Sequence, residues 1–146
     1  MENKTQIKKL YDIARSSRTT DEFISYIEYV SQGTSFSARD LANKIYKAAM
    51  TKYDATLRER VDAIKVNTDS VADQMYSVKA FAIRYGLMSD YAFYLERLVI
   101  LGEQFDMTSA LNRLTEAAIT MYDMRLRRKI DILTGITIIG GYKDAV

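Results

Sequence analysis

The residues that could do chemistry in this chain are carboxylates and cations, because the sequence contains no histidine and no cysteine. Imidazole and thiol side chains are the usual general bases, nucleophiles and ligands for transition metals near neutral pH. Without them, carboxylate sites for Mg²⁺ or Ca²⁺ and a glycosidase-type carboxylate pair remain conceivable. Such a pair needs an acid of raised pKa in a pocket, which spacing alone does not indicate. We therefore expect a protein that is not an enzyme and that has no cofactor or metal.

Two stretches each place an arginine between carboxylates four residues away on both sides. The six residues are Asp54, Arg58 and Asp62 in the first stretch and Asp123, Arg127 and Asp131 in the second. Residues four apart are neighbours on a helix, so each stretch predicts a line of ion pairs along one helix face. A solvated line adds only about 0.2–0.5 kcal/mol per pair. Alternatively, the two stretches meet where two parts of the chain pack, as one polar network that fixes their orientation.

Tyrosine is frequent, with eleven tyrosines against five phenylalanines. A tyrosine combines apolar area with a polar tip, which suits half-exposed faces and interfaces. Two of the short helices expected below carry two tyrosines each, which are Tyr26, Tyr29, Tyr91 and Tyr94. They predict a protein-docking face. The alternative is a rim of half-buried core tyrosines.

Apolar residues recur at intervals of three and four along nearly the whole chain, which is the period of a helix and predicts an all-α fold. Six helices are expected, over residues 4–16, 20–32, 38–66, from 70 or 71 to 86, 89–102 and 106–134. The helix starts are indicated by capping residues. These are Thr19 with Glu22 as a capping box, or Thr20 instead, then Ser37, Asp69 or Ser70, Ser89 and Asp106. The glycines that are expected to end helices are Gly33, Gly86, Gly102 and Gly135.

The chain also resembles itself. Shifted by 69 residues without a gap, segment 45–64 lies over segment 114–133 with eight of twenty positions identical. The same shift aligns Gly33 with Gly102 at two predicted helix ends and Phe36 with Phe105 before two predicted caps. We therefore expect one compact domain, residues 1–146, in which a six-helix bundle is built from two tandem three-helix repeats, 1–68 and 70–137. The alternative is a chance match between two amphipathic helices.

The stretch MRLRRKIDILTGITIIGG, residues 124–141, places four cations in five positions before a run of isoleucines. Two of these cations match basic residues of the first repeat, and only Arg125 and Arg128 are new. The group Arg125, Arg128 and Lys129 is a candidate for contacts with nucleic-acid phosphates. A net charge of only +2 weakens this interpretation, because nucleic-acid-binding proteins usually carry a larger basic surplus.

Residues 136–146 have no counterpart in the first repeat. The stretch ITIIGGYKDAV is β-branched and apolar and then contains two glycines, which is strand rather than helix chemistry. Ile136, Ile138 and Ile139 need to be covered by other apolar groups. We expect a short extended C-terminal tail that either folds back over its own bundle or docks on a neighbouring subunit.

Composition places the chain among ordinary globular proteins, with 48% hydrophobic and 27% charged residues in a length of 146. A chain of this length buries roughly two-thirds of its unfolded surface, so it needs no disulfide or metal to fold. The first twenty residues contain no apolar core of a signal peptide, and no stretch approaches the ~20 apolar residues of a membrane-spanning helix. We expect a cytoplasmic protein without a membrane span.

These observations favour a helical assembly or adaptor protein that acts through protein contacts with itself or a partner, most simply as a homo-oligomer. Among such proteins we favour a viral or phage structural or accessory component, located in the host cytoplasm or the virion. Two alternatives stay open. One is a helical nucleic-acid-binding subunit of a ribonucleoprotein or DNA complex, and the other is a protein inhibitor that binds a host enzyme or complex.

Overall fold

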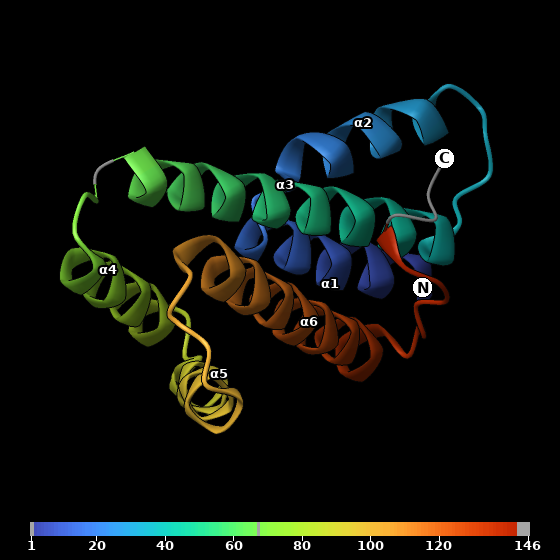
Figure 1. Ribbon diagram of the computed structural model, residues 1–146. Helices are drawn as coiled ribbons and strands as arrows, with labels where there is room; N and C mark the ends of the chain where they lie inside the picture. The colour runs from blue at the N-terminus through green and yellow to red at the C-terminus, as the bar shows by residue number, and fades with distance from the viewer. Residues whose placement is uncertain (1, 67, 143–146) are drawn as a thin grey trace. The chain divides into compact units, whose positions relative to one another are not determined.

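The computed structural model describes residues 2–66 and 68–142, and over these residues it contains six helices and no strand (Figure 1). The helices are α1 (Glu2–Ser16), α2 (Thr20–Ser31), α3 (Ala38–Val66), α4 (Val71–Arg84), α5 (Met88–Leu101) and α6 (Met107–Thr134). The predicted all-helical class is therefore confirmed. No helix within the described ranges has both the length and the apolar character needed to cross a membrane.

Three helices begin at the polar residues that the sequence indicated. The hydroxyl of Ser37 accepts from the backbone N–H of Asp40 at 3.2 Å, and Ser70 accepts from the third residue of its own helix, α4, at 3.1 Å. The Asp106 carboxylate accepts from the backbone N–H of Ser109 at 3.0 Å and from its hydroxyl. These two hydrogen bonds lower the pKa of Asp106. Each cap satisfies an N–H group that the first turn leaves without a helical partner.

Two other predicted caps are wrong. Thr19 precedes α2 but makes no side-chain cap, because its buried hydroxyl lies instead within hydrogen-bonding distance of Ala14 O and of Ser17 Oγ. The helix α5 starts at Met88, one residue before the predicted Ser89, and the preceding Leu87 is fully buried. Burial of a leucine contributes about 1.5–3 kcal/mol, against about 1 kcal/mol for a hydroxyl cap, so packing decides where this helix begins.

Contacts divide the chain into two units, and each unit draws on both long helices. Unit 1 comprises Met1–Tyr53 and Tyr122–Val146, and unit 2 comprises Asp54–Met121. Unit 1 therefore contains α1, α2, the first part of α3 and the last part of α6. Unit 2 contains the remainder of α3 and α6 together with α4 and α5.

The core of unit 1 forms where α1, α3 and α6 bring their apolar stripes together. Its fully buried side chains include Leu10, Ile13, Leu41, Ile45, Met50 and Ile130. Tyr53 of α3 stacks on Tyr122 of α6 with ring centroids 4.0 Å apart and planes 3° apart. Contacts nearer the start of α3 involve later residues of α6 and beyond, so the two segments run antiparallel within this unit.

The core of unit 2 is built in the same manner from α4, α5 and its parts of the long helices. Its most buried side chains are Leu57, Val78, Ala82, Leu87, Leu111 and Leu114. Thr115 is a buried polar residue in this core, and its hydroxyl donates to Leu111 O at 2.7 Å, four residues back. This bond satisfies the hydroxyl without a second polar side chain.

A buried tyrosine ties down the loop before each long helix. The Tyr26 hydroxyl accepts from the backbone N–H of Ser37 at 2.9 Å and lies 3.2 Å from the carbonyl oxygen of the same residue. The Tyr94 hydroxyl makes the same two contacts with Asp106, at 3.4 and 3.2 Å. In both units the ring meets the phenylalanine that precedes the cap edge-on, at 6.1 and 6.2 Å.

The turns between α1 and α2 and between α4 and α5 also share their geometry. In each, one residue adopts a left-handed conformation, Arg18 with φ 60° and Gly86 with φ 70°. In the first turn Thr19 N donates to Ala14 O at 2.8 Å, and the equivalent bond in the second turn measures 2.7 Å. The two turns thus end their helices by the same backbone hydrogen bond.

We predict that Tyr26→Phe lowers the free energy of unfolding by about 1–3 kcal/mol, because the Ser37 N–H loses the partner that the phenol supplies. Urea unfolding followed by circular dichroism measures this change. The matched control is Tyr29→Phe on the same helix, whose side chain is 56% exposed and which should change stability by less than about 0.5 kcal/mol. Equal effects of the two substitutions would show that the hydroxyl of Tyr26 is not the stabilising group.

Candidate protein-binding surfaces

The second arginine set forms a polar cluster in unit 1. Arg127 Nε donates to Asp123 Oδ1 at 2.8 Å, and its Nη2 donates to the hydroxyl of Tyr46 on α3 at 2.9 Å. The Tyr46 hydroxyl in turn donates to Asp123 Oδ1 in a short hydrogen bond. The Arg127 guanidinium carbon also lies 4.9 Å from the centre of the Tyr46 ring, in cation–π range. Three side chains thus hold one another in a closed triangle.

This environment shifts the protonation equilibria of the cluster. Burial raises the pKa of Tyr46 to about 12, and the hydrogen bond to Asp123 and its negative charge act in the same direction. Arg127 opposes the rise because it favours a phenolate. For Arg127 itself, burial works toward a lower pKa, but hydrogen bonds to Asp123 and Tyr46 outweigh it, so its pKa is raised. Tyr46 therefore remains a neutral donor, and Arg127 remains a cation.

The first arginine set differs from the second. Arg58 Nε donates to Asp54 Oδ1 at 3.0 Å, but the Arg58 side chain is 62% exposed, against 29% for Arg127. Asp62 is exposed and, among the described residues, makes no ion pair with Arg58; the same holds for Asp131 and Arg127. The structure therefore presents Asp54 and Arg58 as a solvated pair and Asp123 and Arg127 as part of a cluster.

Sequence reasoning missed Tyr46, the residue that makes the difference. Under the 69-residue shift Tyr46 corresponds to Thr115, which has no phenol to offer to an arginine. The sequence signal that could have found it is an aromatic residue at a position where the other half has a short polar one. Arg39 was missed as well, because its bond is to a carbonyl oxygen 98 residues away.

The segment that follows α6 packs against other residues of unit 1. Arg127 donates through Nη1 to Ile138 O at 2.7 Å and through Nη2 to Gly140 O, and Arg39 donates to Thr137 O at 3.2 Å. Figure 1 shows this segment running beside the first turn of α3. The side chains of Ile136 and Ile138 are buried, whereas Ile139 is 83% exposed. Residues 143–146 of the predicted tail lie outside the described residues.

The predicted phosphate-binding cations do not form a common site. Lys129 Nζ donates to Ser16 Oγ at the end of α1 at 2.7 Å. Arg125 and Arg128 are exposed on α6 and, within the described part of the chain, form no ion pair. One of the three cations is thus engaged in holding α1, and two are available to an anion. No group of three or more acidic residues in the described ranges is placed to hold a metal ion.

Of the four predicted docking tyrosines, only Tyr29 offers much surface. Tyr26, Tyr91 and Tyr94 are each less than 9% exposed. The Tyr91 hydroxyl donates to Met75 O at 3.4 Å, and burial raises the pKa of this phenol. These three tyrosines therefore pack inside their units, where their hydroxyl groups contact backbone atoms.

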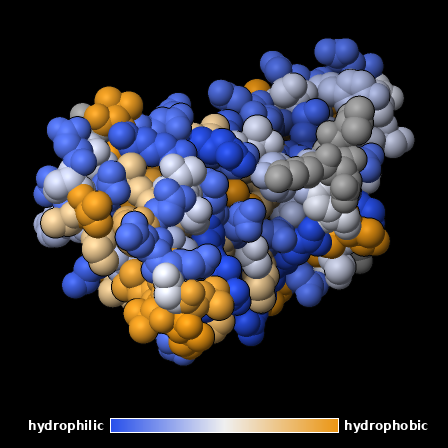
Figure 2. Space-filling view, viewed as in Figure 1, coloured by the Kyte–Doolittle hydropathy of each residue, from blue (hydrophilic) through white to orange (hydrophobic). Residues whose placement is uncertain are grey.

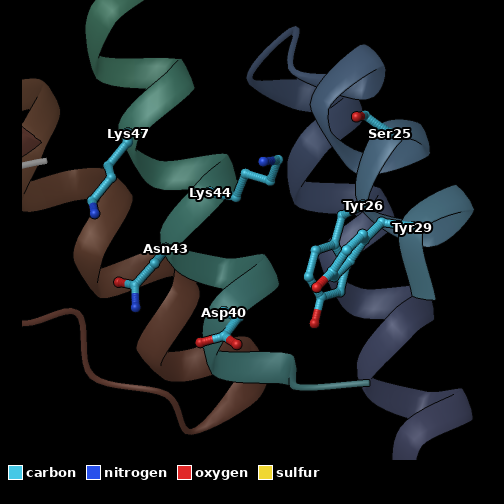
Figure 3. A pocket seen from close by; sticks show the side chains of 7 residues that line it. All are labelled: Ser25, Tyr26, Tyr29, Asp40, Asn43, Lys44 and Lys47. Atoms are coloured by element: carbon cyan, nitrogen blue, oxygen red, sulfur yellow. The ribbon is translucent and has the colours of Figure 1, made fainter. Parts of the chain in front are cut away.

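A hollow of about 590 Å³ lies between α2 and α3, next to Tyr29 (Figure 3). Lys44 extends from α3 toward α2 and the tyrosine rings, whereas Lys47 and Asn43 leave α3 on the side away from them. The cationic groups therefore do not converge on one point. The hollow does not have the arrangement of a site built around a single anion.

Among the six described helices, α5 in unit 2 has the most exposed large apolar side chains. Tyr91 and Tyr94 of this helix face the core of unit 2, and most of the remaining apolar side chains of the helix face solvent. We use the name α5 surface for Met88, Phe93, Val99, Ile100 and Leu101, which are between 40% and 82% exposed. Figure 2 shows hydrophobic side chains gathered over this helix. An apolar groove of about 380 Å³ between α4 and α5 lies beside it and includes Met88.

The comparisons with known proteins found no relative: no family model matches the chain, and neither a curated protein nor a solved structure matches it.

We predict that Arg127→Leu lowers the free energy of unfolding by about 2 kcal/mol or more, because Asp123, Tyr46 and two carbonyl groups lose a charged donor. Arg58→Leu is the matched control at the equivalent position and should cost less than about 0.5 kcal/mol. Denaturant unfolding of both variants measures the difference. A similar small loss in both would mean that the cluster around Arg127 is worth no more than a solvated ion pair.

A second prediction concerns pH. The folded-state pKa of Tyr46, about 12, lies above its ordinary value of 10.0. The folded state therefore holds this proton more tightly than the unfolded state does, and the stabilisation is complete below pH 10 and is lost as the pH rises toward 12. We expect the free energy of unfolding to fall over this interval and to fall less steeply in Tyr46→Phe. Identical slopes in the two proteins would contradict the raised pKa.

Proposed function

We propose that this protein acts through protein–protein contacts, as a self-associating helical assembly protein, and that the α5 surface is the contact. The proposal is supported by the chain's lack of histidine and cysteine, which removes the commonest catalytic groups, and by the concentration of exposed apolar side chains on one helix. An exposed cluster of this kind is typical of interaction sites in folded proteins.

The size of the α5 surface fits a partner of protein dimensions. Summed over their exposed fractions, the five residues present on the order of 500 Å² of apolar area, which lies within the range of the largest patch on a typical monomer. Isolated monomers seldom leave a larger patch than about 300–600 Å² uncovered, and one side of a standard interface buries about 800 Å². The adjacent groove between α4 and α5 supplies further apolar area. The surface is therefore large enough to form the centre of an interface.

Charge favours a second copy as the partner. The exposed residues Glu96 and Arg97 lie side by side in the sequence, between Phe93 and Val99 on the same helix. When two α5 helices pack antiparallel about a two-fold axis, Glu96 of one copy can approach Arg97 of the other, twice over. Such an isologous contact is the commonest arrangement in homo-oligomers. One residue of each sign can be self-complementary across a two-fold axis, which two residues of the same sign could not be.

We also propose that the chain is a duplicated three-helix unit, as its internal similarity suggests. Support comes from the tyrosine that holds each cap and from the matching turns before α2 and α5. The left-handed turn residues are 68 positions apart in the sequence, and so are Tyr26 and Tyr94. The caps Ser37 and Asp106 are 69 positions apart, so the second half has one extra residue between its tyrosine and its cap. The two units correspond under the 69-residue shift. This shift moves residues 1–53 of unit 1 onto residues 70–122, of which all but the last belong to unit 2.

An adaptor or inhibitor that binds a different protein would use the same surface, and a viral or phage accessory protein of this kind stays within the proposal. The nucleic-acid alternative depends on Arg125 and Arg128, since Lys129 already donates to Ser16. Two exposed arginines predict at most a small number of released counterions and a shallow dependence of affinity on salt. The α5 surface therefore favours a protein partner.

The decisive test is light scattering of the full chain over a range of concentrations, with Val99→Glu as the perturbing variant. We expect the unmodified protein to form a dimer or larger oligomer, and Val99→Glu to weaken association by tenfold or more, which corresponds to about 1.4 kcal/mol. A carboxylate on this surface would have to be buried without a partner.

Val66→Glu is the matched control, since Val66 also lies in the last turn of a helix in unit 2 and is 79% exposed, against 82% for Val99. It should leave association unchanged. A protein that stays monomeric at every concentration, or that associates equally well in both variants, would rule out the α5 surface as a self-contact.

A further inference from the structure

The segment 136–140 is recognised in the manner of a bound peptide. Arg39 and Arg127 donate to its backbone carbonyl oxygens at 137, 138 and 140, and the side chains of 136 and 138 are buried while those of 137 and 139 are exposed. Alternate side chains on opposite sides are characteristic of an extended chain. The recognition depends on main-chain groups and two apolar positions, which is how proteins bind extended segments.

Part of the binding surface is held by contacts that do not involve the segment. Asp123 and Tyr46 bind the Arg127 guanidinium through Nε and Nη2, and Nη1 donates to the carbonyl oxygen of Ile138. A fixed arginine loses little side-chain entropy when a ligand arrives. We call these residues, together with Arg39, the Arg127 groove.

We propose that the Arg127 groove accepts the C-terminal segment of a second copy, so that two chains associate by exchanging their residues 136–140. The occupant follows from the structure, because Arg127 already binds this segment in its own chain. Exchange replaces each contact by an identical contact from the other copy, so no side-chain interaction is lost. It uses unit 1 and does not depend on the α5 surface.

The connection to the segment allows such an exchange. Gly135 is the single residue between the end of α6 at Thr134 and the buried Ile136, and it has φ +73°. A glycine can move between left-handed and extended conformations at little cost, whereas other residues cannot. No atom beyond its chain neighbours lies within 4 Å of the position that a Cβ would occupy. A change of backbone direction at this residue is therefore not restricted by a side chain of its own.

Apolar residues around the segment's exit supply the driving force. Ile132 and Leu133 precede the hinge and are 71% and 38% exposed, and Ile139 within the segment is 83% exposed. When the segment docks in its own chain, these three side chains remain exposed to solvent. An exchanged dimer brings two such exits together and covers them, which offsets the entropy lost on association.

Because the chain contains no cysteine, single introduced thiols report the exchange directly. Both reporter chains carry Val99→Glu, so that contact through α5 does not bring copies together. One chain carries Thr137→Cys, which leaves the carbonyl group that Arg39 binds, and the other carries Asp40→Cys beside Arg39. The two are mixed and treated with a short bismaleimide. A third chain with both cysteines tests docking within one molecule.

Exchange predicts a cross-linked dimer in the mixture, roughly tenfold more abundant than in a control mixture of Thr137→Cys with Glu28→Cys, because a docked segment has a millimolar effective concentration at the groove. Glu28 is an exposed residue of α2 in the same unit. If the double variant cross-links only within one chain and the mixture gives no dimer, the segment docks in its own chain and the proposal is wrong. Equal dimer in both mixtures would also overturn it, because the contact would then not involve the Arg127 groove.

Discussion

The guanidinium group of Arg127 is the interaction on which the organisation of unit 1 depends. It has five N–H donors in one plane and distributes them to a carboxylate on its own helix, a phenol on α3 and two carbonyl oxygens of the segment after α6. One side chain therefore joins its own helix to α3, 81 residues away in the sequence, and to the segment 11 to 13 residues further along the chain. A lysine could not do this, because its three donors do not form a planar fork.

The cluster is stable because each of its polar groups is satisfied by another. Asp123 accepts from both Arg127 and Tyr46, so its charge is opposed by a cation and shared with a neutral donor. Tyr46 is almost fully buried, and a phenol without a partner there would cost more than its hydrogen bond returns. The aromatic ring also covers the face of the guanidinium. Within the described part of the chain, Arg58 donates to no phenol and to no carbonyl group, and its side chain remains 62% exposed.

The helical periods, the glycines and most polar caps predicted where the elements lie, because these signals act between residues close in sequence. The failures have tertiary causes. Thr19 and Leu87 are buried at turns, and their burial decides the backbone there. Periodicity identified Tyr26, Tyr91 and Tyr94 as helical residues, but it did not indicate that their hydroxyl groups would contact backbone atoms 11 to 16 residues away. The partners of Arg127 include Tyr46, 81 residues distant, which local spacing does not reveal.

Two differences between the halves of the chain change which apolar surface is covered. At the position of Tyr46 the second half has the buried Thr115, whose hydroxyl needs only its own helix. Under the 69-residue shift, the segment after α6 corresponds to the connection into α4 and the start of that helix. Unit 1 thus covers part of its apolar area with Ile136 and Ile138, while unit 2 leaves the α5 surface open. If both halves descend from one three-helix unit, as we propose, a single tyrosine and an added segment were enough to give them different surfaces: one that holds an extended segment of its own chain, and one that exposes an apolar helix.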